Sequence, residues 1–82
     1  MAIFKVTFRN ALNSEGEPFE LPADELNANG VMIDSYGYVE REIRGGDNFS
    51  RDLWEFEISD KDTDRFIEGL KLTPNVIEYK KE

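Results

Sequence analysis

The chain of 82 residues contains no cysteine and no histidine. Without cysteine it can form no disulfide, thiol nucleophile, iron–sulfur cluster or thiolate zinc site. Without histidine it lacks imidazole acid–base catalysis, Ser-His-Asp triads and the commonest transition-metal ligand. Only carboxylates, Lys, Tyr, Ser and Thr remain as catalytic groups. We therefore predict a protein that is not an enzyme, with no catalytic residue, no cofactor and no metal site.

Long apolar runs are also missing. No stretch approaches the roughly 20 residues that cross a bilayer, and the N-terminus lacks the basic and apolar regions of a signal peptide. We therefore expect a cytoplasmic protein that does not bind membranes. With 39% apolar residues in 82, the chain can build one core, which predicts a single small domain over residues 1–82.

Basic residues are scarce and unevenly placed. Ten Lys and Arg face eighteen Asp and Glu, which gives a net charge of −8, and no basic residue lies between Arg9 and Arg41. The acids of this stretch are Glu15, Glu17, Glu20, Asp24, Glu25, Asp34 and Glu40. Direct binding to nucleic acid is not expected at this charge. The stretch is either a solvated loop that keeps the protein soluble or a docking surface for a basic partner.

Three segments alternate apolar and polar residues with the period of two that is typical of half-buried strands. They are residues 3–9, 53–58 and 76–80. The apolar positions of the first two are Phe4, Val6, Phe8, Trp54, Phe56 and Ile58. A less regular alternation over residues 38–44 predicts a further strand, and 45–48 reads as the hairpin loop after it.

Residues 60–71 change to the period of an amphipathic helix. Its apolar stripe consists of Thr63, Phe66, Ile67 and Leu70. Ser59 or Asp60 is the predicted N-cap, and Pro74 ends the segment.

The segment before the irregular strand has two interpretations. Residues 21–26 have an early proline followed by acids, which predicts a short helix with Asn29-Gly30 as its left-handed stop. In the other interpretation, Asn29-Gly30 forms a type I′ hairpin turn. We favour the helix because Pro22 and Asp24 are poor strand residues.

The expected order of elements is strand, short helix, strand, strand, helix, strand. This order resembles the βαββαβ ferredoxin-like topology, although it does not point to any one family. The resemblance implies an α+β fold with a four-stranded antiparallel sheet, with helix 60–71 on one face and a first helix that is short or degenerate. The strands would lie in the order fourth, first, third, second.

This order places the first strand centrally and sets its cations beside the acids of its neighbours. Lys5 and Arg9 would lie between two groups of acids, Glu55 and Glu57 on one side and Glu78 on the other. Such cross-strand pairs are favourable, by about 0.2–1 kcal/mol each.

Four acids remain incompletely neutralised in this arrangement. Glu40 and Glu42 on the edge strand would lie opposite Glu55 and Glu57, on the face that also carries Tyr38. Like charges across a ladder are unfavourable. The four acids either keep the edge from aggregating or receive a basic partner or a divalent cation, and paired-carboxylate hydrolysis is a remote alternative.

Arg41 would fall on the apolar face, between Val39 and Ile43. An uncompensated guanidinium is costly there, so Arg41 either extends past the sheet edge or pairs with an acid across an interface. We therefore predict a protein-binding or assembly module, homodimeric. Its partner-binding residues would be Tyr38, Glu40, Arg41, Glu42, Glu55 and Glu57. The alternative is an acidic inhibitor or nucleic-acid mimic, of the kind that phages use, which binds a basic partner.

Overall fold

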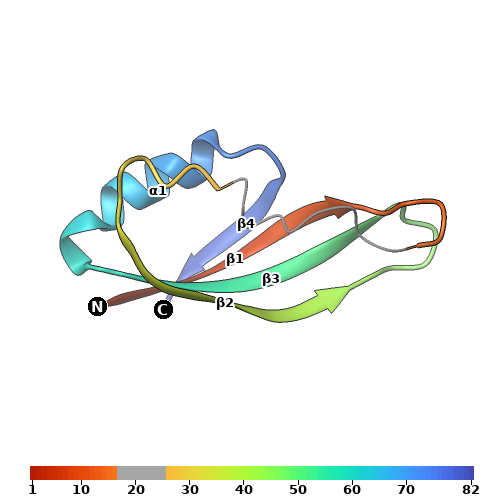
Figure 1. The fold of residues 1–82 in the computed structure, drawn as a ribbon, viewed down its shortest axis with the longest axis horizontal. Helices are drawn as coiled ribbons and strands as arrows, with labels where there is room; N and C mark the ends of the chain where they lie inside the picture. Colours follow the sequence, from red (N-terminus) through yellow and green to blue (C-terminus); the bar gives the residue numbers. More distant parts are fainter. Residues whose placement is uncertain (17–25) are drawn as a thin grey trace.

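The alternating segments form the strands of an antiparallel sheet in the computed structural model, which describes residues 1–16 and 26–82 (Figure 1). The elements of these residues are β1 (Ala2–Ala11), β2 (Ile33–Glu42), β3 (Phe49–Ile58), the 3-10 helix η2 (Asp60–Asp62), α1 (Thr63–Leu72) and β4 (Val76–Lys81). The described part of the chain is therefore an α+β structure with one α-helix and four strands.

The strands lie in the order β2-β3-β1-β4, so β1 and β3 are central and β2 and β4 are the edges. These neighbours are the ones that the sequence led us to expect. The ferredoxin-like topology also needs a helix between β1 and β2. The helix expected over residues 21–26 lies outside the described residues except for Leu26, which is not helical.

The β1–β3 ladder runs without a shift from Ala2 opposite Ile58 to Ala11 opposite Phe49. Because the register never slips, alternate residues of both strands keep to one face. The predicted apolar positions share that face and are buried: Phe4, Val6, Phe8, Trp54, Phe56 and Ile58. We call it the core face, and the opposite side of the sheet the open face.

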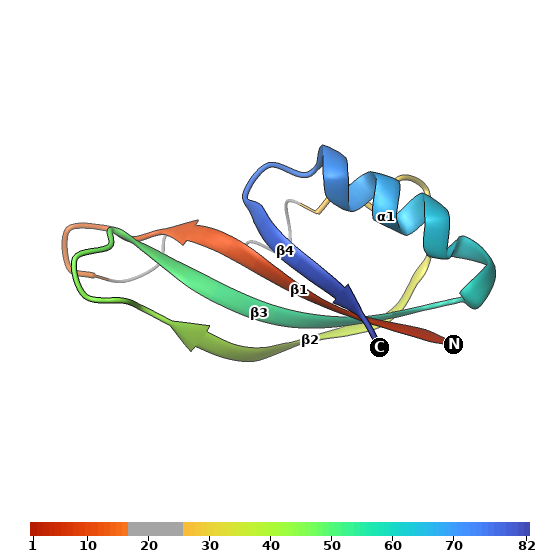
Figure 2. The ribbon, with the colours of Figure 1, turned by 180° about the vertical axis from the view of Figure 1, so that it is seen from behind.

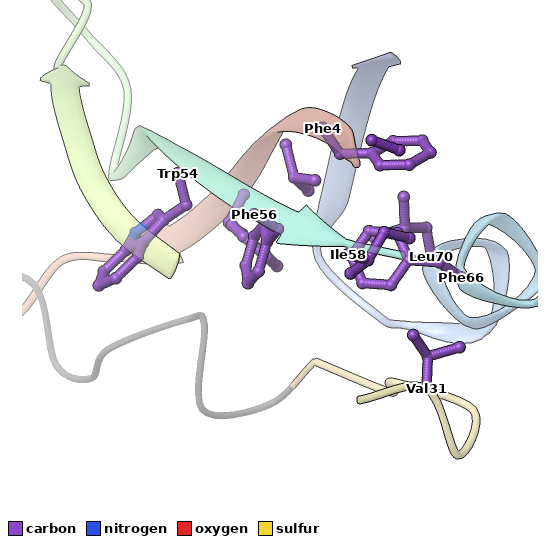
Figure 3. Close-up of a cluster of buried hydrophobic side chains, with 10 residues drawn as sticks. Phe4, Val31, Trp54, Phe56, Ile58, Phe66 and Leu70 are labelled. Atoms are coloured by element: carbon purple, nitrogen blue, oxygen red, sulfur yellow. The ribbon is translucent and has the colours of Figure 1, made fainter. Parts of the chain in front are cut away.

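Helix α1 packs on the core face, as predicted. Its Phe66 and Leu70 are buried, and the Phe66 ring centroid lies 5.0 Å from that of Phe4 and 5.8 Å from that of Phe56. Figure 3 shows Phe66 and Leu70 at one end of the cluster and Trp54 at the other.

The helix is much shorter than the sheet. Ten helical residues extend about 15 Å, whereas ten strand residues extend about 34 Å. Figures 1 and 2 show α1 at the end of the sheet where the two termini lie, and no described segment covers the open face. No helix of the described residues is long and apolar enough to cross a membrane.

The start of the helix differs from the prediction. The chain enters α1 through η2, and Asp62 is the residue before its first turn. Neither Ser59 before η2 nor Asp62 before α1 forms a side-chain capping hydrogen bond. Instead the Thr63 hydroxyl donates to the Asp60 carbonyl at 2.9 Å. The predicted cap at Ser59 or Asp60 is wrong because a 3-10 turn precedes the α-helix.

Asn29 and Gly30 form a tight turn before β2. Both have positive φ, 52° and 77°, and the Val31 N–H donates to the Ala28 carbonyl at 2.9 Å. Two consecutive left-handed residues are the mark of a type I′ turn. Asn29-Gly30 therefore forms the type I′ turn of the alternative interpretation. Residues 26–28 before it are neither helix nor strand, so within the described residues it ends no helix and joins no hairpin.

The residues before this turn pack directly on α1. Thr73 Oγ1 accepts from the Asn27 N–H at 3.0 Å and donates to the Gly69 carbonyl at 2.7 Å. A Cβ at Gly69 would lie 2.2 Å from the carbonyl oxygen of Asn27, so only glycine permits this approach. Asn29 and Arg65 add two further hydrogen bonds to the same contact.

Candidate functional site: the edge strand β2

Two bulges interrupt the pairing of β2 with β3. Tyr38 lies opposite Trp54, but Glu40 lies opposite Leu53, so Val39 is an extra residue. A second shift, between Ile33 and Ser35, leaves Asp34 as an extra residue. A one-residue bulge reverses the alternation of the residues that follow it.

The bulge at Val39 decides which side chains share a face. Tyr38 pairs with Trp54 on the core face, whereas Glu40 and Glu42 lie on the open face. The prediction that Tyr38 shares a face with these two acids is therefore wrong, because unbroken alternation ignores the extra residue.

The four acids do not form the expected like-charge ladder. Glu40 lies opposite Leu53 and Glu42 opposite Arg51. On the β3 side, Glu55 lies opposite Gly37 and Glu57 opposite Ser35. All four acids share the open face, but none lies directly opposite another, so the predicted cross-strand repulsion is wrong.

The cations of β1 follow the prediction only in part. Lys5 lies opposite Glu55, as expected, but its ion pair is with Glu82 at 3.0 Å. The hydrogen bond that Lys5 donates to this carboxylate raises the pKa of Lys5. Arg9 lies opposite Arg51 rather than beside an acid.

The two arginines are held by an aromatic ring. Their guanidinium carbons lie 4.5 Å (Arg9) and 4.7 Å (Arg51) from the ring centroid of Phe49. Arg51 also donates to Asp47 at 2.8 Å. Cation–π contacts of this kind are worth about 0.5–1 kcal/mol at exposed sites.

The open face has two hollows that share Thr7, Leu53 and Glu78. The hollow next to β2 has a volume of about 210 Å³ and is also lined by Glu40, Glu42, Arg44 and Arg51. The hollow next to β4 has a volume of about 220 Å³ and is also lined by Lys5, Tyr79 and Lys80. Within the described residues, no group of three or more carboxylates is placed to hold a metal ion.

Arg41 has its partner within the same chain. Its Nε donates to Asp52 Oδ1 at 2.8 Å and its Nη2 donates to Oδ2 at 2.9 Å. Asp52 is fully buried and also accepts from Ser50 Oγ at 2.7 Å and from Asn10 Nδ2 at 3.1 Å. The acid that we expected across an interface is therefore Asp52, and no partner protein is needed to compensate Arg41.

The protonation of Asp52 is set by two opposing effects. Burial alone would raise its pKa, but hydrogen bonds from Arg41, Ser50 and Asn10 stabilise the carboxylate and hold the pKa below its usual range. The same pairing raises the pKa of Arg41. A bidentate pair of this kind orients the guanidinium and the carboxylate together.

The sequence contains a signal for the buried position of Asp52. Its strand was expected to begin at Leu53, whereas β3 begins at Phe49. Two residues before Trp54, the same alternation places Asp52 on the core face. A buried acid at that position needs a cation, and Arg41 was already predicted on the core face.

Aromatic side chains of β2 cover the same face. Tyr36 and Tyr38 are 59% and 54% exposed as whole residues, whereas Trp54 beneath them is 8% exposed. Tyr36 stacks on Phe56 with centroids 6.0 Å apart, and Tyr38 meets Trp54 edge-on at 6.0 Å. Arg41 lies over the Tyr38 ring at 5.9 Å. We call Tyr36, Tyr38 and Trp54 the aromatic surface.

The Trp54 indole N–H is buried and has no hydrogen-bond partner among the residues that the structure describes. Burying such a donor costs about 1–3 kcal/mol. Tyr36 and Trp54 were not among the predicted site residues, because Trp54 was assigned to the apolar positions of its strand and Tyr36 lies before the strand predicted at residues 38–44.

Exposed large apolar side chains are concentrated around β2. Nine occur in the described residues, and five of them lie between positions 32 and 43: Met32, Tyr36, Tyr38, Val39 and Ile43. No described strand pairs with the outer edge of β2. The edge therefore combines unpaired backbone groups with exposed aromatic rings.

The six predicted site residues thus divide between two faces. Tyr38 and Arg41 lie together on the core face, and Glu40, Glu42, Glu55 and Glu57 lie on the open face. No family model, curated protein or solved structure matches the chain.

Proposed function

We propose that the protein is a non-catalytic, cytoplasmic protein-binding module that receives an extended segment of a partner at the outer edge of β2. The observation that carries this proposal is the concentration of exposed apolar side chains in β2 and directly beside it, where five of the nine in the described residues lie. Strand addition to a free sheet edge is a recurring mode of peptide recognition, with main-chain hydrogen bonds for affinity and side-chain contacts for specificity.

The aromatic surface supports this proposal through its composition and its rigidity. Tyr, Trp and Arg are the residues most enriched at the energetic centres of protein interfaces. Trp54 supports Tyr38 from below, and Arg41 is fixed by Asp52. Side chains that are already ordered lose little conformational entropy when a partner binds.

We also propose the ferredoxin-like topology for this module. The support is the strand order and the position of α1 between β3 and β4, which both run antiparallel to β1. A helix that connects two parallel strands across a central one is the second half of that topology.

The partner can be a second copy of the chain, which would make the protein the predicted homodimer. One feature weighs against it, namely the net charge of −8 on each copy, because two such copies repel each other. Light scattering at high micromolar concentration tests this version. A dimer supports it, whereas a monomer leaves only foreign partners.

The proposal as a whole is tested by capture from cells of the native host. We expect Tyr38→Ala to lose the captured partner and Tyr79→Ala to keep it, because Tyr79 is an exposed tyrosine on the opposite edge strand, β4. Both variants must melt like the parent. Loss of capture with Tyr79→Ala and retention with Tyr38→Ala would contradict a β2 site.

The second candidate is an acidic inhibitor or nucleic-acid mimic. Seven of the eighteen acids and none of the ten bases lie between Arg9 and Arg41, which leaves eleven acids against ten bases elsewhere. Nearly all of the net charge therefore belongs to one stretch. Affinity for a basic partner should then fall steeply as salt is raised, whereas binding through an apolar edge should change little.

A further inference from the structure

We infer that the β2 edge is shaped for a foreign segment in which apolar and basic residues alternate. This inference rests on the proposed function and adds the chemistry of the partner. A strand that joins the sheet continues its pleat, so its successive side chains point to opposite faces. Each row of partner side chains therefore meets a different row of β2.

On the core face, the partner row meets the aromatic surface. Tyr36 and Tyr38 expose more than half of their side chains there. Apolar or aromatic partner residues would cover these rings, and aromatic pairs on one sheet face stabilise a ladder by about 0.2–1 kcal/mol each. The core-face row of the partner should therefore be apolar.

On the open face, the partner row meets acids. Glu40 has no ion pair in the described residues, while Glu42 pairs with Arg44. Glu55 and Glu57 lie one strand further in on the same face. Lysine or arginine in the partner's open-face row would give Glu40 a counter-charge, and the net charge of −8 would attract such a segment from a distance.

The bulge at Val39 is what separates these two rows. If Val39 paired regularly with β3 instead of forming a bulge, Tyr38 and Glu40 would lie on one face, and a single partner side chain would meet both a ring and a carboxylate. With the bulge, the aromatic row and the acidic row lie on opposite sides of the same edge. An alternating sequence fits this edge, whereas a sequence with its basic residues in one block does not.

Two synthetic peptides of ten residues test the inference. One alternates lysine and valine, and the other has the same composition with all lysines first. We expect calorimetry at physiological salt to show at least tenfold tighter binding of the alternating peptide. Equal affinity of the two peptides would mean attraction by charge alone and would overturn the inference.

Matched variants locate the binding. Glu40→Gln should weaken binding of the alternating peptide several-fold and reduce its salt dependence, because it removes a carboxylate of β2 that has no ion pair in the described residues. Glu68→Gln removes the same charge from the exposed surface of α1 and should leave binding unchanged. Equal effects of the two variants would overturn the inference.

Backbone pairing is tested with peptides whose amides are N-methylated on one edge only. Methylation on the edge that faces β2 should abolish binding, and methylation on the other edge should not. Equal binding of both peptides would exclude strand addition. If neither lysine peptide binds while Tyr38→Ala still abolishes capture of the natural partner, the inference fails and the proposed function stands.

Discussion

β1 and β2 are both ten residues long and belong to the same sheet, yet their side chains are ordered in different ways. β1 alternates between the faces along its length, and its core-face residues are buried. β2 contains two bulges and is mostly exposed. A central strand is held in register by neighbours on both sides, whereas an edge strand can accommodate an extra residue by bending outward.

This difference separates residues that stabilise the fold from residues that are exposed for binding. The core-face side chains of β1 lie beneath α1 and at the centre of the apolar cluster. The side chains of β2 contribute exposed rings, exposed acids and one buried ion pair. Substitutions should therefore act mainly on folding at β1 and mainly on binding at β2, except where β2 contacts Asp52.

The largest effect is expected where α1 meets β1. Phe66→Ala removes a fully buried ring from contact with Phe4 and Phe56. We expect a loss of about 3–5 kcal/mol in the free energy of unfolding, which is most of the stability of a small protein. Urea unfolding followed by circular dichroism measures it. A variant that melts within a few degrees of the parent would contradict the packing of α1 on the sheet.

The next largest effect is expected at the buried ion pair between Arg41 of β2 and Asp52 of β3. Asp52→Asn leaves Arg41 without its carboxylate and should cost about 3 kcal/mol, because breaking a buried pair exposes its desolvation cost. Asp47→Asn is the matched control. It breaks an equally short pair with Arg51 that remains partly exposed, and should cost about 0.5 kcal/mol. Equal losses would show that burial does not distinguish the two pairs.

The contribution of Asp52 should also depend on pH. Its pKa in the folded protein lies below the ordinary value of 3.8, so the folded state favours the carboxylate. The stabilisation is complete above the ordinary pKa and is lost as the pH falls through the lowered one. The stability difference between the parent and Asp52→Asn should therefore be largest near neutral pH and shrink below about pH 3.8. A constant difference would contradict this linkage.

A smaller effect is expected when the bulge is removed. Deletion of Val39 should leave Tyr38 and Arg41 on the core face and Glu40 on the open face, because regular alternation then gives the same assignment. The loss in the free energy of unfolding should not exceed about 1 kcal/mol. Chemical shifts of the β2 amides and a melting curve check this. Loss of folding would show that Val39 is not an extra residue.

The smallest effect tests the register of β2. Glu42→Lys should destabilise slightly, by about 0.5 kcal/mol, because Glu42 lies opposite Arg51 and pairs with Arg44. Glu57→Lys should be neutral, since Glu57 lies between Ser35 and Ile3. Stabilisation by Glu42→Lys would instead support the like-charge ladder that unbroken alternation predicts.

The sequence predicted the parts of the fold that a period alone determines. Alternation in β1 and β3 identified the core face because their mutual register never shifts. The helical stripe with Phe66 and Leu70 was identified because the period of α1 is equally regular. The faces of β2 could not be predicted, because nothing in the residues around Val39 distinguishes a bulge from regular pairing.

For the candidate site, the sequence pointed to individual residues but not to their surroundings. Tyr38 and Arg41 were selected from the sequence as residues that needed an explanation, but their surroundings depend on register. Arg41 pairs with Asp52, one residue before the expected start of a strand, and Tyr38 meets Trp54 instead of the acids. Contacts between strands far apart in sequence cannot be inferred from the period within each strand.

The contact at Gly69 implies an order of events in folding. The Gly69 carbonyl and the Thr73 hydroxyl that hold the Asn27 segment are brought together by the last turn of α1. The segment can therefore dock only after the helix has formed. Thr73→Val removes the hydroxyl that accepts from the Asn27 N–H, so it should speed unfolding and leave the folding rate almost unchanged, as for any contact made after the transition state. The junction that leads into β2 would then be the last part of the described chain to become ordered.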